Sequence, residues 1–342
     1  MSLGSRFYRQ KGRVTMDENE LMGSMKVSKA VAKMAIPSVI SSLVTVVYNM
    51  ADTFFVGQTG DPLQVAAVSL TNPIFILFMA FANMFGMGGS AAASMALGEK
   101  KEKRVKQVSS FITYASLIVG IVFAAILLVG MQPVLQLFGA DADTYELAKG
   151  YTTYISYGAP FIIWSAAASF VVRADGASRE AMTGSMIGTV ANIILDPIFI
   201  SGFGMGAAGA AIATTIGNIM ASVYYLWYFC RKSRNMSMAF RYFKCGDRIL
   251  SQVCSAGLPT AIFSALMSIS TIILNQILVA YGNAFPATIL SILRQGVLLI
   301  PVLYGLNAFL GLDSEEIYQA LTDYVAVLLS IVIWRWKRRK TL

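Results

Sequence analysis

The hydrophobic positions of this chain gather into nine long runs separated by short polar segments. An α-helix needs about 20 mostly apolar residues to cross the hydrocarbon core of a bilayer, and the runs reach that length. The pattern therefore predicts an all-α polytopic membrane protein. The nine predicted helices cover residues 34–58, 63–97, 107–132, 148–172, 181–203, 206–230, 251–281, 287–306 and 317–336.

The polar segments between these runs predict how the helices are oriented. Lysine and arginine concentrate in the N-terminal tail and in alternate loops, whereas the loops between those carry a single basic residue, Lys149. Because basic loops remain in the cytoplasm, the N-terminus of this multi-pass cell-membrane protein is expected to be cytoplasmic. The basic segments are 1–33, 98–107, 173–180 and 231–248, and the others are 57–63, 138–149 and 201–206.

Composition excludes several classes of function. Charged residues make up 13% of the chain, against about 25% in soluble domains. The chain has no histidine, which excludes imidazole catalysis and histidine-bound zinc, and no span holds a recognisable catalytic pair. We therefore expect neither an enzyme nor a cofactor. The net charge of +9 is a topology signal that places basic loops beside membrane lipid, and we expect no nucleic-acid partner.

Two internal similarities predict a duplicated architecture with a missing part. Pro37 and Pro259 open similar helices 222 residues apart, whereas Pro197 and Pro301 occupy similar positions only 104 residues apart. One two-fold repeat accommodates both offsets only if about 118 residues, or about three helices with their loops, are missing from the second half. Internal repeats of this kind are typical of transporters.

Acidic side chains inside the spans are the strongest candidates for function, because a charge in the membrane is costly. Between residues 34 and 300 the spans contain two, Asp52 and Asp196. At about 1.5 Å per residue, Asp52 lies roughly 8 Å below the outer end of its helix, and Asp196 and Thr214 lie roughly 12 Å below theirs. Asn192 is one turn from Asp196, as Asn49 and Tyr48 are from Asp52. The spacing predicts a polar cluster in the outer half of the first six helices.

Five segments of the chain resemble the multidrug and toxic compound extrusion (MATE) transporters. Residues 37–57 (PSVISSLVTVVYNMADTFFVG) resemble the first helix of that family, and Asn192 to Pro197, with the small residues 204–211, resemble its fifth and sixth helices. Arg294-Gln295-Gly296 and residues 319–330 resemble its eleventh and twelfth. Helices equivalent to the family's eighth to tenth are absent, and the seventh carries no acid.

The resemblance implies two helical lobes around a central cleft and export of drugs, often organic cations, in exchange for H⁺ or Na⁺. It implies a complete six-helix N-lobe and a truncated three-helix C-lobe. It also implies that Asp52, Asn192, Asp196 and Thr214 take part in cation coupling, with a tyrosine that we assign to Tyr151 rather than Tyr154 or Tyr157. No metal site is expected beyond a possible Na⁺ at Asp52 and Asp196.

The predicted domains follow from these spans. They are a cytoplasmic tail (1–33), the N-lobe (34–230), a basic cytoplasmic linker (231–250), the C-lobe remnant (251–336) and a basic tail (337–342). The missing part contains an odd number of helices, so its loss reverses the orientation of every segment that follows. If all nine segments spanned the membrane, the basic tail would lie outside the cell, against the positive-inside rule. We expect that tail in the cytoplasm and 287–306 re-entrant or interfacial.

Other readings stay open at the level of sequence. The chain could be an internally deleted, transport-inactive member of the family, stabilised by a second copy of itself. It could also be a lipid-linked saccharide flippase of the same superfamily, for which a cationic cavity is expected and only Arg294 is available. The sequence does not distinguish H⁺ from Na⁺ and does not identify the drugs.

Overall fold

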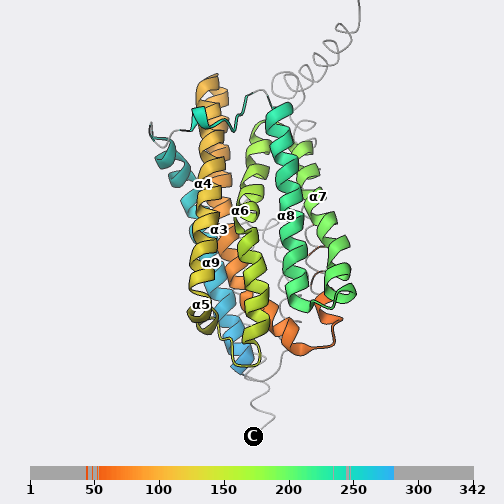
Figure 1. The fold of residues 1–342 in the computed structure, drawn as a ribbon. Coiled ribbons are helices and arrows are strands. Elements are labelled where there is room, and N and C mark those ends of the chain that lie inside the picture. Colours follow the sequence, from red (N-terminus) through yellow and green to blue (C-terminus); the bar gives the residue numbers. More distant parts are fainter. Residues whose placement is uncertain are drawn as a thin grey trace, which may run out of the picture. The chain divides into compact units, whose positions relative to one another are not determined.

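The computed structural model describes residues 54–233, 235–243, 246 and 248–280, together with Val44, Tyr48 and Asp52. Within these residues all regular structure is helical, with no strand (Figure 1). Five of the described helices are long and apolar enough to cross a membrane. The all-α membrane fold predicted from hydropathy is therefore confirmed for this part of the chain.

The second to seventh predicted spans each correspond to a helix. Most of the first span, and all of 287–306 and 317–336, lie outside the described residues, so the composition of the two lobes stays a prediction. The described elements are α3 (Pro62–Gly98), α4 (Glu102–Val129), α5 (Met131–Leu137), α6 (Tyr145–Ala174), α7 (Ser178–Pro197), the π-helix η1 (Ile198–Gly202), α8 (Gly206–Arg231), the 3₁₀-helix η2 (Phe240–Tyr242) and α9 (Ile249–Ala280).

The bounds of α4 differ from the predicted span 107–132. The helix begins at Glu102, because charged residues continue the α-helix beyond its apolar part and hydropathy detects only that part. It ends at Val129, where Gly130 interrupts it, and α5 follows with Pro133 in its first turn, the position in a helix that tolerates proline.

Helix α6 is the centre of the described bundle. It packs against α3, α4 and α8, and α7 packs against α8 (Figure 1). Small residues allow these close contacts: a Cβ atom on Gly120 of α4 would lie 2.4 Å from Cα of Pro160 in α6, and one on Gly217 of α8 would lie 2.6 Å from the carbonyl oxygen of Gly188 in α7. Because there is little hydrophobic driving force between helices in lipid, close packing of this kind holds them together.

The segment after α8 is fastened to α4 by hydrogen bonds. Ser109 Oγ donates to the carbonyl of Ser237 at 2.9 Å, and Tyr114 Oη donates to the carbonyl of Met238 at 3.0 Å. The rings of Phe240 and Phe243 also pack against Tyr114. Residues 235–243 of the predicted linker thus have a defined path along α4.

The first part of α9 packs directly against α3. A Cβ atom on Gly88 would lie 2.0 Å from the carbonyl oxygen of Val253, and one on Gly257 would lie 2.0 Å from that of Met84. Residues up to Ser268 form one compact unit with the preceding helices, whereas Ile269 to Leu342 form a second. The predicted boundary between the lobes, at 231–250, stays a prediction.

Candidate functional site

The end of α7 carries the buried carboxylate around which the candidate site is built. Asp196 is fully buried, and Asn192, one turn earlier on the same face, is also buried. Pro197 follows and cannot donate a backbone hydrogen bond, and the chain widens there into the π-helix η1. This break ends α7 directly after Asp196 and places its carboxylate beside α8.

Hydrogen bonds connect Asp196 to α8 through Asn192. The Asn192 amide nitrogen donates to Asp196 Oδ2 at 2.8 Å, and its oxygen accepts from the backbone N–H of Thr214 at 2.9 Å and from the Thr214 hydroxyl at 3.1 Å. The Thr214 N–H can only donate, so it fixes this orientation of the amide. Tyr48 Oη lies 3.5 Å from the same threonine hydroxyl.

Asp52 and Tyr151 complete the group. Asp52 is near enough to Asp196 for the two carboxylates to interact electrostatically, and both interact in the same way with the phenol of Tyr151. We call the six residues of this group the carboxylate cluster. They are Tyr48, Asp52, Tyr151, Asn192, Asp196 and Thr214.

Two carboxylate oxygens of the cluster are left without a hydrogen bond. Asp52 Oδ1 and Asp196 Oδ1 are buried and have no hydrogen-bond partner among the described residues. A buried polar atom of this kind is rare, because leaving it unpaired costs free energy. The two oxygens are therefore available to a proton or to a small cation.

The donor set suits H⁺ or Na⁺ better than a transition metal. In the described part of the chain, no group of three or more His, Cys, Asp or Glu could hold a metal ion. The oxygens that could complete a Na⁺ site beside Asp52 and Asp196 are the neutral ones of Asn192 and Thr214. Hard cations such as Na⁺ take oxygen ligands of this type.

The structure brings together all five residues that the sequence singled out. Among the three tyrosines of α6, Tyr151 is 8% exposed, whereas Tyr154 is 37% and Tyr157 is 59% exposed. Only Tyr151 is therefore buried with the carboxylates. The sequence placed Tyr48 one turn before Asp52 in the predicted polar cluster, but it did not assign Tyr48 a part in cation coupling. The positions of these residues do not test their role in cation coupling, which stays a prediction.

A second polar contact, which the sequence did not predict, joins the N-terminal parts of α3 and α8. Gln64 Oε1 accepts a hydrogen bond from the backbone N–H of Ala207 at 2.8 Å. Gly206 makes this possible, because its φ of +53° favours glycine and a Cβ atom there would lie 2.5 Å from the Gln64 side chain. The contact fixes the start of α8, which carries Thr214 two turns later.

Comparison with known proteins points to one family. The MatE family model matches residues 37–198. The chain is 35% identical over 257 residues to the multidrug export protein MepA of Staphylococcus saprophyticus, and 33% identical over the same length to MepA of Staphylococcus aureus. Each match covers 75% of this chain but 57% of the relative, so the chain aligns with little more than half of these proteins.

Solved structures give the same result. A MATE crystal structure in complex with MaD3S is 27% identical, with a TM-score of 0.71, over 90% of this chain and 66% of that one. An inward-facing multidrug resistance MATE transporter of the MOP superfamily is 28% identical, with a TM-score of 0.64, over 72% of this chain and 56% of that one.

Proposed function

Because the chain belongs to the MATE family, whose members are transporters and not enzymes, we propose that it exports drugs or other toxic organic compounds across the membrane in exchange for a cation. The staphylococcal relatives named for multidrug export support the substrate class. The substrates that we propose are several organic compounds of different structure, including organic cations.

We assign binding of the coupling ion, H⁺ or Na⁺, to the carboxylate cluster. The observation that carries this assignment is the pair of buried oxygens on Asp52 and Asp196 that have no hydrogen bond within the described residues. Two carboxylates in a low-dielectric site repel each other strongly, and one proton or one Na⁺ relieves that repulsion. Asn192 and Thr214 hold Asp196 in place for this exchange.

Ion binding at the cluster can drive export because it changes the charge of a buried site. With one H⁺ or Na⁺ bound, the net charge of the two carboxylates falls from −2 to −1; without that ion, the larger negative charge attracts a cationic substrate more strongly. A cation entering from outside and an organic cation leaving would therefore compete for the same charge. Competition of this kind couples the two fluxes without requiring both ligands to bind at once.

The test is export by the chain itself, reconstituted into liposomes with ethidium as the probe. We expect ethidium exchange driven by an imposed H⁺ or Na⁺ gradient, and Asp52→Asn and Asp196→Asn should each abolish it. Asp61→Asn is the matched control, because Asp61 is the N-cap of α3 and lies outside the cluster. Separate H⁺ and Na⁺ gradients identify the coupling ion.

Two outcomes would overturn the proposal. Undiminished exchange in both aspartate variants would show that the cluster does not couple transport. No exchange in the unmodified chain, in liposomes where a full-length MATE transporter is active, would show that this chain is a transport-inactive member of the family.

A further inference from the structure

Polar side chains follow one face of α8 along most of its length. Thr214, Asn218, Ser222, Tyr225 and Tyr228 are spaced by three or four residues, so they lie on the same face of the helix. All but Asn218 are buried. At 1.5 Å per residue these positions span about 21 Å, most of the thickness of a hydrocarbon core of about 30 Å.

The part of this face nearest the carboxylate cluster is hydrogen-bonded to α6. Asn218 Nδ2 donates to the carbonyl of Thr214 at 2.9 Å, and Ser165 Oγ lies 3.0 Å from Asn218 Oδ1, to which it donates. One turn further along α8, Ser222 Oγ donates to the carbonyl of Phe161 at 3.3 Å.

The next turns continue between α6 and α7. The phenol of Tyr225 interacts with the hydroxyls of Ser169 in α6 and Ser185 in α7, and donates to the carbonyl of Ala181 at 2.8 Å. We call the hydroxyl and amide groups on this path the polar seam. Its members are Thr214, Asn218, Ser165, Ser222, Ser169, Ser185, Tyr225 and Tyr228.

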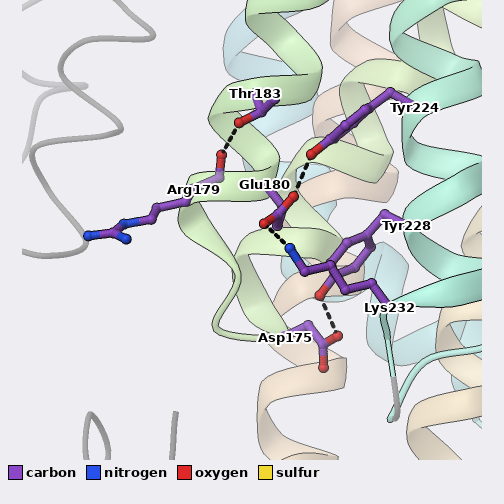
Figure 2. Close-up of polar contacts among 7 residues, drawn as sticks. All are labelled: Asp175, Arg179, Glu180, Thr183, Tyr224, Tyr228 and Lys232. Carbon is purple, nitrogen blue, oxygen red and sulfur yellow. Dashed lines mark hydrogen bonds and ion pairs between the residues drawn. The ribbon is translucent and has the colours of Figure 1, made fainter. Parts of the chain in front are cut away.

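The polar seam ends at a carboxylate in the turn between α6 and α7. Tyr228 Oη donates to Asp175 Oδ2 at 2.8 Å (Figure 2). Ser233 donates to the same oxygen at 2.8 Å and Asn235 donates to Oδ1 at 3.2 Å. Burial raises the pKa of the Asp175 carboxyl above its usual value, although these hydrogen bonds oppose the shift.

The other charged groups around this turn are already engaged or point elsewhere. Glu180 pairs with Lys232 and accepts from Tyr224, while Arg179 points away from Asp175 (Figure 2). Arg173 stacks over the ring of Phe170. Asp175 is therefore the acid in this turn that is bonded to the polar seam, and it forms no ion pair with any of the described residues.

A row of buried polar groups through the membrane-spanning part of a lobe calls for an explanation, because apolar residues would pack there at lower cost. We propose that the polar seam is the route by which a proton taken up at Asp52 and Asp196 reaches the cytoplasmic side, with the carboxylate of Asp175 as the last acceptor. The inference rests on the proposed function and specifies the coupling ion as H⁺.

The transfer is a proton relay in which no other bond changes. The carboxylic acid of Asp196 gives up its proton, each hydroxyl along the seam accepts one proton and passes on its own, and Asp175 releases a proton to water. Along α8, Ser222, Tyr225 and Tyr228 follow one another at a rise of about 4.5 Å, a gap that one water molecule can bridge by hydrogen bonds. Thr214 and Ser222 are about 12 Å apart, and the hydroxyl of Ser165, which donates to Asn218 between them, divides that gap into two that water can bridge. The amide of Asn218 does not ionise and holds its neighbours in position.

The relay is closed in the conformation described here. At the level of Asn218, the backbones of α7 and α8 meet where Gly188 faces Gly217, with 2.6 Å between the carbonyl oxygen of Gly188 and a Cβ atom placed on Gly217. Such a contact limits entry of water into the middle of the seam. A closed middle is what an exchanger needs, because an open relay would let protons leak without export.

The experiment separates passage of the proton from its binding at the cluster. Tyr228→Phe keeps the ring and removes the hydroxyl, and Asp175→Asn removes the last acceptor. In liposomes, we expect both variants to exchange ethidium in a proton gradient more slowly than the unmodified chain, by about tenfold or more. The reason is that each variant loses a group that transfers the proton. In detergent, ethidium binding and its dependence on pH should be unchanged, and Asp175→Glu should restore exchange.

Tyr114→Phe is the matched control, because its hydroxyl donates to the carbonyl of Met238 and lies off the seam. If Asp175→Asn does not fold, Tyr228→Phe decides alone. Exchange at the unmodified rate in the folded variants overturns the proton route and leaves the proposed function intact. Exchange driven by Na⁺ without any dependence on pH also overturns the route alone. An unmodified chain that neither binds nor exchanges ethidium overturns both proposals.

Discussion

Thr214 is the residue at which the hydrogen bonds of the carboxylate cluster converge. Its backbone N–H and hydroxyl both reach Asn192, and Asn192 in turn donates to Asp196. The orientation of Asp196 thus depends on a threonine of another helix. The Thr214 hydroxyl helps to orient the Asn192 amide, whereas the carboxylates supply the negative charge of the cluster.

Thr214→Val retains the volume of the side chain and removes that hydroxyl. We expect the free energy of unfolding to fall by about 1 kcal/mol, because a buried hydrogen bond is lost. Thermal unfolding in detergent measures this effect. The control is Thr153→Val, whose hydroxyl donates to the carbonyl of Lys149 in its own helix through an exposed hydrogen bond. A loss in Thr214→Val no larger than that in the control would contradict the prediction.

Asp175 makes a prediction about pH. Its pKa is raised in the folded chain above the usual value of 3.8, so the folded state holds this proton more tightly than the unfolded state does. The stabilisation from Asp175 is then complete below pH 3.8 and is lost as the pH rises through the raised pKa. We expect the melting temperature of Asp175→Asn to fall less between acid and neutral pH than that of the unmodified chain. Equal changes of the melting temperature with pH in the variant and the unmodified chain would refute this prediction.

At the scale of helices, glycine decides where α3 and α9 meet. The two helices cross at Gly88 and Gly257, and in each case the carbonyl oxygen of the other helix occupies the space that a side chain would need. The composition of α9 alone does not reveal this contact. The crossing brings the first part of the seventh predicted helix into the same compact unit as the helices before it.

Gly88→Ala and Gly257→Ala test this crossing. Each added methyl group meets backbone rather than a flexible side chain, so we expect a loss of about 1–3 kcal/mol in the free energy of unfolding. Gly98→Ala is the matched control, because Gly98 ends α3 and nothing lies within 4 Å of its added Cβ atom. Losses equal to that of the control would mean that the helices do not approach this closely in the membrane.

At the scale of the whole molecule, the orientation in the membrane is set by basic residues. The loop that joins α3 to α4 and the start of α4 together carry five lysine or arginine residues within 100–106, whereas the loop before α6 is acidic. The positive-inside rule therefore predicts that the two loops lie on opposite sides of the membrane, with the first in the cytoplasm.

Single cysteines in a background without the three native ones test this orientation with an impermeant maleimide on intact cells. We expect Asp143→Cys to be labelled from outside and Lys103→Cys to be labelled only after the cells are opened; both positions are exposed. Leu342→Cys extends the test to the basic tail, for which we predict protection. Labelling of Lys103→Cys in intact cells would show that the topology is the reverse of the predicted one. Labelling of Leu342→Cys in intact cells would show that all nine predicted segments span.

The sequence by itself predicted the six long helices among the described elements, although not α5, η1 or η2, and it singled out Asp52 and Asp196 of the carboxylate cluster. Long apolar runs admit one solution in lipid, since an α-helix satisfies its own backbone hydrogen bonds. Asp52 and Asp196 stood out for a related reason, because an acid inside such a run is too costly to be incidental. Neither inference requires knowledge of which helices are neighbours.

Tertiary structure alone decided what each of these residues touches. Hydropathy does not record that Asn192 bridges Asp196 and Thr214, that Tyr151 is buried while Tyr157 is exposed, or that Asp175 lies at the end of a row of hydroxyls from three helices. These contacts join residues far apart in the chain. They depend on how closely the helices approach, and that distance is set by glycines such as Gly188 and Gly217, whose partners become apparent only when the chain is folded.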